Sequence, residues 1–199
     1  MKKGLKIFLC ILACILTVLV VTFLIYFIDY SSLPEMDVQE VPLGMEWGMT
    51  RKEVEDILAQ HPEYSFNKYE TMLVYNVVNY QGIDHLSGQT IFRFDESGGL
   101  CMVYYMFRST DAKNGMSTSD ALKLGYKSTR KQFRKHYEAP HIFATASIKL
   151  FSISGGDNWI GEESFVSTNY EEADKFYMVY EPIESNQEFV DMLQDPFAE

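Results

Sequence analysis

The sequence predicts an α+β protein that has an N-terminal transmembrane helix followed by an extracytoplasmic domain of helices packed on an antiparallel sheet. Residues 7–28 form an uncharged, apolar run of 22 residues, long enough to span a hydrocarbon core of about 30 Å as a helix. Two amphipathic helical patterns follow, and each precedes short segments rich in β-branched and aromatic residues. Helices placed before antiparallel strands are typical of two-layer α+β domains.

The charges around the apolar run predict its orientation. Lys2, Lys3 and Lys6 precede the run and Asp29 follows it. The positive-inside bias therefore places the N-terminal tail in the cytoplasm and the rest of the chain outside the cell membrane, as a single-pass protein.

We interpret the run as a retained anchor. It exceeds the roughly 15 residues of a signal-peptide core, and no Ala-x-Ala site follows it. Lipoprotein processing at Cys14, within the degenerate lipobox Ile11-Leu12-Ala13-Cys14, is the alternative. We prefer the interpretation of the cysteines as ordinary apolar helix residues, because cleavage would leave a long apolar N-terminus.

The predicted domain organisation follows from these boundaries. A polar, proline-containing stretch separates the apolar run from the remaining domain, which itself contains two series of a helix followed by strands. The predicted parts are a cytoplasmic tail (1–6), the transmembrane helix (7–28), a stalk (29–42) and an extracytoplasmic domain (43–199) with halves at 43–110 and 117–199.

Composition narrows the classes of function. Thirteen Tyr and 14 Phe supply a sizeable core. Beyond the apolar run, 14 Lys and Arg remain against 28 Asp and Glu, which excludes a nucleic-acid binder that needs a basic face. Cys101 is the sole cysteine after residue 28, so no disulfide can form within that part of the chain.

The first half of the predicted domain contains the clearest local sequence motif. Thr50-Arg51-Lys52-Glu53 is a capping box that predicts a helix over residues 50–60, ended by Pro62. Strands are predicted at 71–80, 89–94 and 100–108, with a loop from Gly82 to Gly88, a tight turn from Asp95 to Gly99 and a linker over 109–117. The last of these strands is apolar on both faces, which predicts a central strand covered on each side.

The second half begins with a predicted helix over about 119–137. Its apolar stripe comprises Leu122, Tyr126, Thr129, Phe133 and Tyr137, and the adjoining basic stripe comprises Lys123, Lys127, Arg130, Lys131, Arg134 and Lys135. Strands are predicted at 142–153, 160–168 and 175–183, with a turn over Ser154–Asn158 between the first two. A second capping box, Ser185–Glu188, predicts a short C-terminal helix.

The segment Gly44-Met45-Glu46-Trp47-Gly48-Met49-Thr50, together with the helix that follows, resembles the opening motif of the SmpA/OmlA (BamE)-like small envelope proteins. These in turn resemble the two-repeat β-lactamase-inhibitor-protein fold. The hairpin Phe94-Asp95-Glu96-Ser97-Gly98-Gly99-Leu100 is similar to the hairpin of that motif but one residue longer, and the match spans about residues 44–107. The resemblance implies a non-catalytic binding or scaffold module of the cell envelope. The apolar helix departs from the lipoprotein anchor of that family.

The sequence predicts that the chain is not an enzyme and holds no metal or cofactor. His61, His85, His136 and His141 show no paired metal-ligand spacing. The loop segment Asp84-His85-Leu86-Ser87 contains triad residue types, but neighbours on one loop cannot face one another as nucleophile, base and orienting group. The glycine pairs lie in predicted turns rather than in a phosphate-binding loop. Cys101 is interpreted as a small apolar residue of a strand.

Charge segregation leads to two functional hypotheses. Residues 157–199 hold 12 acidic residues against Lys175 alone. We expect a membrane-anchored module that recognises another envelope or secreted protein. The alternative is an immunity or inhibitor protein that neutralises a cationic secreted toxin or enzyme. A plain solvated surface also accounts for the charges. The candidate partner-binding residues are Glu162, Glu163, Glu171, Glu172, Asp174, Lys127, Arg130 and Arg134.

Overall fold

The computed structural model describes residues 2–68, 72–108, 118–137, 147–149, 152–171 and 175–187. The chain divides into two compact units, Met1–Pro34 and Glu35–Glu199. The second unit holds the sheet and is called the domain below.

The first unit consists of helix α1 (Lys2–Ser31), so the prediction of a helix over residues 7–28 is confirmed. The prediction that this helix crosses a membrane is wrong. Among the residues that the structure describes, no helix combines sufficient length with sufficient apolarity to do so.

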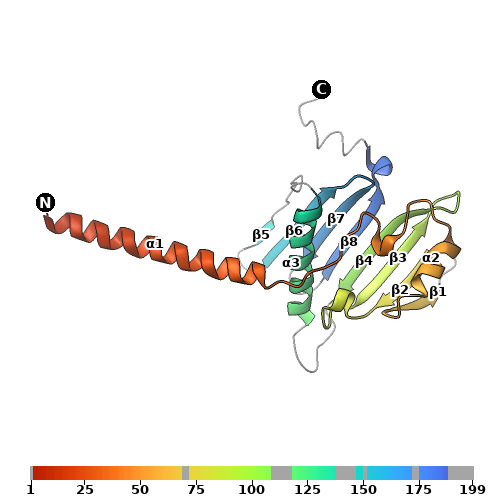
Figure 1. The fold of residues 1–199 in the computed structure, drawn as a ribbon, viewed down its shortest axis with the longest axis horizontal. Helices are drawn as coiled ribbons and strands as arrows, with labels where there is room; N and C mark the ends of the chain where they lie inside the picture. Colours follow the sequence, from red (N-terminus) through yellow and green to blue (C-terminus); the bar gives the residue numbers. More distant parts are fainter. Residues whose placement is uncertain are drawn as a thin grey trace. The chain divides into compact units, whose positions relative to one another are not determined.

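The domain is built on an antiparallel sheet whose strand order is β1-β2-β3-β4-β8-β7-β6-β5 (Figure 1). Each half of the chain forms a meander of consecutive strands, and the two meanders join where β4 pairs with β8. The two halves therefore share one continuous sheet, and the α+β class of the domain is confirmed. The strands are β1 (Tyr64–Lys68), β2 (Met72–Val77), β3 (Gly88–Phe94), β4 (Leu100–Arg108), β5 (Ser147–Lys149), β6 (Ser152–Ile160), β7 (Ser164–Glu171) and β8 (Lys175–Pro182).

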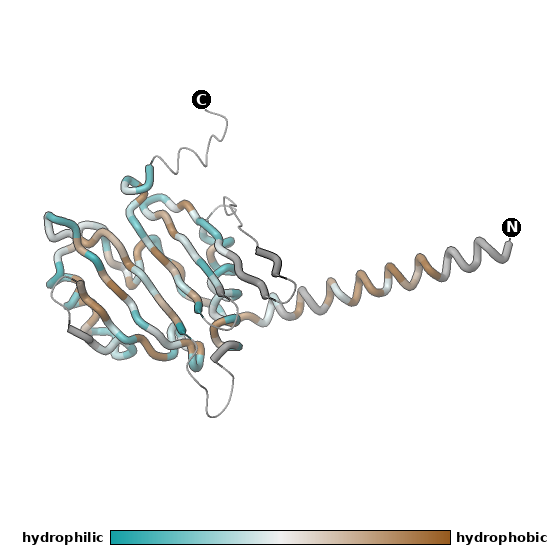
Figure 2. The backbone as a smooth tube through the Cα atoms, turned by 180° about the vertical axis from the view of Figure 1, so that it is seen from behind, coloured by the Kyte–Doolittle hydropathy of each residue, from teal (hydrophilic) through white to brown (hydrophobic). Residues whose placement is uncertain are grey.

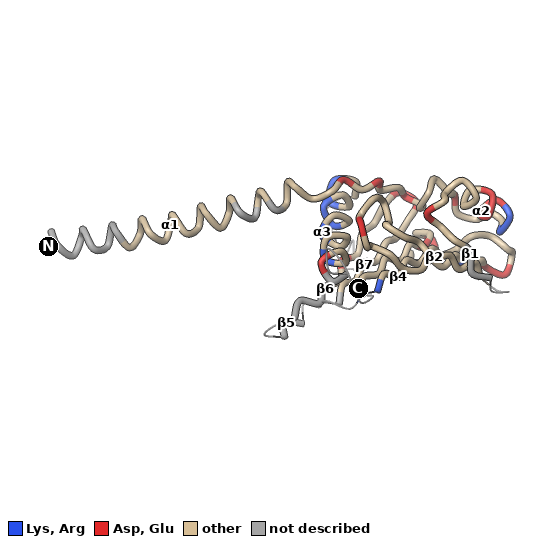
Figure 3. Tube along the Cα trace, turned by 90° about the horizontal axis from the view of Figure 1, so that it is seen from below, with Lys and Arg blue, Asp and Glu red and all other residues tan. Residues whose placement is uncertain are grey.

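Helices α2 (Arg51–Leu58) and α3 (Thr118–His136) lie on the same face of this sheet (Figure 3). The predicted capping box is formed at α2: the Thr50 hydroxyl accepts a hydrogen bond from the Glu53 amide, and the Glu53 carboxylate accepts one from the Thr50 amide at 2.8 Å. Three short 3-10 turns complete the fold: η1 (Pro42–Gly44), η2 (Tyr80–Gly82) and η3 (Ile183–Asn186).

The main core lies between the sheet and these helices. The predicted apolar stripe of α3 faces it, since Leu122, Thr129, Phe133 and Tyr137 are buried. Residues 35–49, which we call the strap, run over the same face of the sheet and contribute Met36, Val41 and Met45 to the core. Because the strap has no regular secondary structure apart from η1, its position depends on side-chain hydrogen bonds described below.

Three sequence-based predictions need correction. The expected turn at Ser154–Asn158 lies within β6, because Gly155 and Gly156 pair with Tyr170 and Asn169 in the ladder to β7. The turn instead lies at residues 161–163, which were expected in a strand. Strand β1 was not predicted at all. The predicted linker 109–117, the start of the strand at 142–153 and most of the C-terminal helix lie outside the described residues.

Candidate functional site

The face of the sheet opposite the helices is the first candidate site. On β4, Val103, Tyr105 and Phe107 point to the helix face and are fully buried, whereas Tyr104 and Met106 alternate with them and are half-buried. In Figure 3, and in the rear view of Figure 2, helices α2 and α3 and the strap lie on the other side of the sheet. Neither α2 nor α3 covers the Tyr104 side, which we call the open face.

The strand register gathers apolar side chains in the middle of the open face. Ile91 pairs with Tyr104, which pairs with Val179, and Met106 pairs with Tyr177 on the same side. The Tyr104 and Tyr177 rings stack with centroids 6.2 Å apart. Each member of this set is half-buried. The open-face patch consists of Ile91, Met102, Tyr104, Met106, Tyr177 and Val179.

Arginines border this patch. Arg93 of β3 and Arg108 at the end of β4 are both exposed, and their strand positions place them on the open face. The Arg93 guanidinium contacts the Met102 sulfur at 3.9 Å. The chain carries a formal charge of −11, so two exposed arginines beside an apolar patch depart from its general charge.

The predicted basic stripe of α3 does not form one binding surface. Lys123 and Arg134 are exposed and Lys127 is half-buried, but Arg130 turns to the sheet, where its Nε lies 2.8 Å from Oδ2 of Asp157. The side chain of Asp157 is only 3% exposed and also accepts a hydrogen bond from the Tyr126 hydroxyl at 3.1 Å. The pairing of Arg130 with Asp157 therefore links α3 to β6.

The predicted acidic residues are also divided. Glu162 and Glu163 are exposed together in the turn between β6 and β7. Glu171 ends β7, and Glu172 and Asp174 lie outside the described residues. Among the described residues, the structure brings Glu162 and Glu163 together.

The turn that holds Glu162 and Glu163 is also where the strap is attached. The Glu40 carboxylate accepts hydrogen bonds from the amides of Glu163 at 3.3 Å and Ser164 at 3.2 Å. The Ser164 hydroxyl donates to the Glu40 carbonyl and accepts from the Trp47 indole at 3.1 Å. Gly161 makes this contact possible, because a Cβ there would lie 2.1 Å from Oε2 of Glu40.

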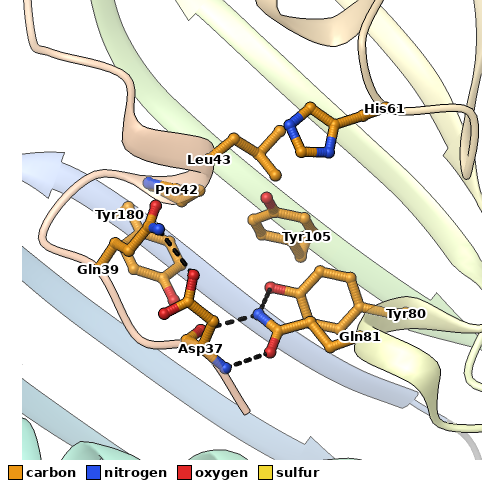
Figure 4. Close-up of a pocket in the computed structure, with 9 residues that line it drawn as sticks. All are labelled: Asp37, Gln39, Pro42, Leu43, His61, Tyr80, Gln81, Tyr105 and Tyr180. Atoms are coloured by element: carbon orange, nitrogen blue, oxygen red, sulfur yellow. Dashed lines mark hydrogen bonds between the residues drawn. The ribbon is translucent and has the colours of Figure 1, made fainter.

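A cavity of about 140 Å³ between the strap and the sheet is the second candidate site (Figure 4). Its lining combines three buried tyrosines with polar side chains of the strap and of the loop after β2. Tyr105 comes from β4, Tyr180 from β8 and Tyr80 from η2. The remaining lining residues are Asp37, Gln39, Pro42, Leu43, His61 and Gln81.

Hydrogen bonds hold the rim of this cavity in place. The Asp37 amide donates to Oε1 of Gln81 at 2.6 Å, and Nε2 of Gln81 donates to the Asp37 carbonyl at 2.8 Å. Gln39 donates to Oδ2 of Asp37 at 2.7 Å, as Figure 4 shows. The rim therefore has few alternative arrangements, even though Asp37 and Gln81 are exposed.

Two lining residues have left-handed backbone conformations, Leu43 with φ 63° and Gln81 with φ 48°. Such conformations cost about 1–3 kcal/mol each in residues other than glycine and tend to occur at ligand sites. The hydrogen bonds of the rim and the burial of the strap offset this cost. The strain therefore marks the cavity as a candidate binding site.

Burial and nearby carboxylates raise the pKa of the tyrosine hydroxyls in and beside the cavity. Burial raises the pKa of Tyr80 to about 12, and the Asp37 carboxylate acts in the same direction. Burial likewise raises the pKa of Tyr180 and of Tyr64 far above the usual value, with Glu40 and Glu63 as the charged neighbours. The hydroxyls are therefore neutral at pH 7 and lie in a region of negative potential.

The histidines do not form a metal site in the described part of the domain. His61 pairs through Nδ1 with Glu63 at 3.0 Å, and Nε2 of His136 lies 3.4 Å from the Glu40 carboxylate. No group of three or more His, Cys, Asp or Glu among the described residues could hold a metal ion. His85 lies exposed in a loop, and His141 lies outside the described residues.

In comparisons with protein-family models, curated proteins and solved structures, no match to this chain was found. The resemblance inferred from residues 44–107 therefore stays a prediction. The open face and the strap cavity could not have been found from the sequence motifs, because their residues come from strands that are distant along the chain.

Proposed function

We propose that this chain is a non-catalytic protein-binding module whose partner docks on the open face of the sheet. The observation that supports the proposal is that β4 is apolar on both faces, whereas α2, α3 and the strap cover one of them. This strand has large apolar side chains on both faces, which is typical of strands covered on both sides. Helices α2 and α3 and the strap cover the side of Val103, Tyr105 and Phe107 (Figure 3). A partner protein would supply the missing cover.

The composition of the open-face patch favours a protein as the ligand. Tyrosine and methionine are enriched in protein interfaces, and energetically important residues cluster at the centre of such patches. Tyr104 and Tyr177 occupy that central position in the strand register. The exposed Arg93 and Arg108 at its border would match a partner that carries carboxylates beside an apolar surface. That this partner is an envelope or secreted protein stays a prediction.

The experiment begins with a photo-crosslinking amino acid placed at Met106 on the open face or at Lys123, which is exposed on α3. Irradiation in the native cells and mass spectrometry identify the protein captured from the Met106 position. The affinity of the purified partner for the full-length chain is then measured by calorimetry.

We expect Tyr104→Ala or Tyr177→Ala to weaken binding about 30-fold, because central aromatic residues contribute about 2 kcal/mol or more to such interfaces. Lys123→Ala serves as the matched control and should leave the affinity unchanged. Circular dichroism confirms that each variant is folded. Equal capture from both positions, or an affinity that neither tyrosine affects, would refute the assignment of the open face.

A further inference from the structure

The strap cavity lies on the helix face of the sheet, so it is distinct from the open face. Its walls come from segments that are far apart in sequence: the strap, the loop after β2, and the central strands β4 and β8. Hydrogen bonds fix the rim before any ligand is present. Such a preformed, polar recess suits a ligand of matching size and chemistry.

The cavity offers acceptors for hydrogen bonds. Tyr180 is only 4% exposed, and its hydroxyl has no hydrogen-bond partner among the described residues. The hydroxyl of Tyr105 lies 3.3 Å from that of Tyr64, which leaves a further lone pair. Gln39 occupies only Oδ2 of the Asp37 carboxylate, so Oδ1 is available to a ligand. A ligand with hydrogen-bond donors finds acceptors here.

The charge of the cavity selects among such ligands. Asp37 forms no ion pair with any described residue, and the Glu40 carboxylate adds negative potential at the Tyr180 hydroxyl. The nearest candidate cation in the lining, His61, already pairs with Glu63. Tyrosine rings also attract cations through their faces. A positively charged ligand would neutralise this uncompensated potential, whereas an anion would add to it.

We propose that the strap cavity binds a primary ammonium group, with Asp37 and the Tyr180 hydroxyl as acceptors of its hydrogen bonds. The volume of about 140 Å³ admits a short alkyl chain behind the ammonium, since a cavity of about 150 Å³ holds benzene. A free alkylamine and the side chain of a lysine both present this chemistry.

The test titrates the full-length chain with n-butylammonium chloride and follows the amide resonances of residues 37–43 and 80–82 by NMR. We expect saturable shifts with a dissociation constant in the millimolar range, as befits so small a ligand. Asp37→Asn should weaken binding at least tenfold, and Tyr180→Phe should weaken it several-fold. Asp84→Asn, an exposed carboxylate outside the cavity, is the matched control and should bind as the unaltered chain does.

A parallel titration with Gly-Lys-Gly blocked at both ends separates the two sources of the ammonium group. Binding of this peptide supports a lysine of a protein, and binding of n-butylammonium alone supports a free amine. n-Butanol tests the requirement for charge. Butanol binding as tight as that of the amine, an Asp37→Asn variant that binds normally, or no saturable shift with either amine would each overturn the proposal. None of these outcomes depends on the open face.

Discussion

The ion pair between Arg130 and Asp157 leads to an asymmetric prediction. Two contacts join the side chains, at 2.8 Å from Nε to Oδ2 and at 3.1 Å from Nη2 to Oδ1. Asp157 is 3% exposed, whereas Arg130 is 39% exposed. Removing either partner breaks the same contacts, but only the loss of the arginine leaves a charge that water cannot reach.

The magnitudes follow from this difference. Arg130→Met keeps much of the aliphatic stem but leaves the Asp157 carboxylate with the Tyr126 hydroxyl alone. Stranding a buried charge costs about 3–5 kcal/mol of the free energy of unfolding. Asp157→Asn keeps the shape and one acceptor, and the half-exposed Arg130 can turn to water, so the expected cost is about 1–2 kcal/mol.

Urea denaturation followed by tryptophan fluorescence measures both costs, because Trp159 is fully buried on the same strand as Asp157. The double variant Arg130→Met with Asp157→Asn should recover part of the loss, since no stranded charge remains. The reasoning fails if Asp157→Asn destabilises the domain as much as Arg130→Met does, or if both variants unfold within 0.5 kcal/mol of the parent chain.

Two further predictions concern the strap and the buried tyrosines. Gly161→Ala should lower the free energy of unfolding by about 1–3 kcal/mol, because the new Cβ displaces the Glu40 carboxylate from the amides of Glu163 and Ser164. In a Glu40→Ala background the same substitution should cost far less. Equal costs in both backgrounds would contradict this role of Gly161. Because the pKa of Tyr80 is raised to about 12 on folding, its neutral form contributes stability that is fully present below about pH 10 and is lost between pH 10 and 12. Over that range the stability of the parent chain in urea should fall by about 2–3 kcal/mol more than that of Tyr80→Phe, because the other buried tyrosines titrate in both; an equal fall in both would refute the assignment.

Local signals in the sequence predicted local structure well. The capping box at Thr50 specified the start of α2, because its donors and acceptors lie within one turn of the chain. The spacing from Leu122 to Tyr137 specified which side of α3 is buried. The tight turn before Leu100 followed from its glycines. Each of these predictions depends on interactions between near neighbours in sequence.

The apolar run at residues 7–28 shows what an apolar composition can and cannot predict. Its pattern correctly predicted a helix, but the structure does not support the membrane crossing that was inferred from the same pattern. The glycines at 155–156 misled in a similar way, because they suggested a turn where the ladder between β6 and β7 continues. A pattern within one segment does not show which neighbouring strand pairs with that segment and continues it as a strand.

What the sequence alone determined, then, is the α+β class of the domain, the two long helical patterns and most strands, all through short-range periodicity and turn chemistry. The tertiary structure alone decided that β4 pairs with β8, that Asp157 is buried against Arg130, and that Asp37, Gln81 and Tyr180 line one cavity. The physical reason is that these contacts join residues tens of positions apart. Their energies depend on the assembled sheet, which no single stretch of sequence contains.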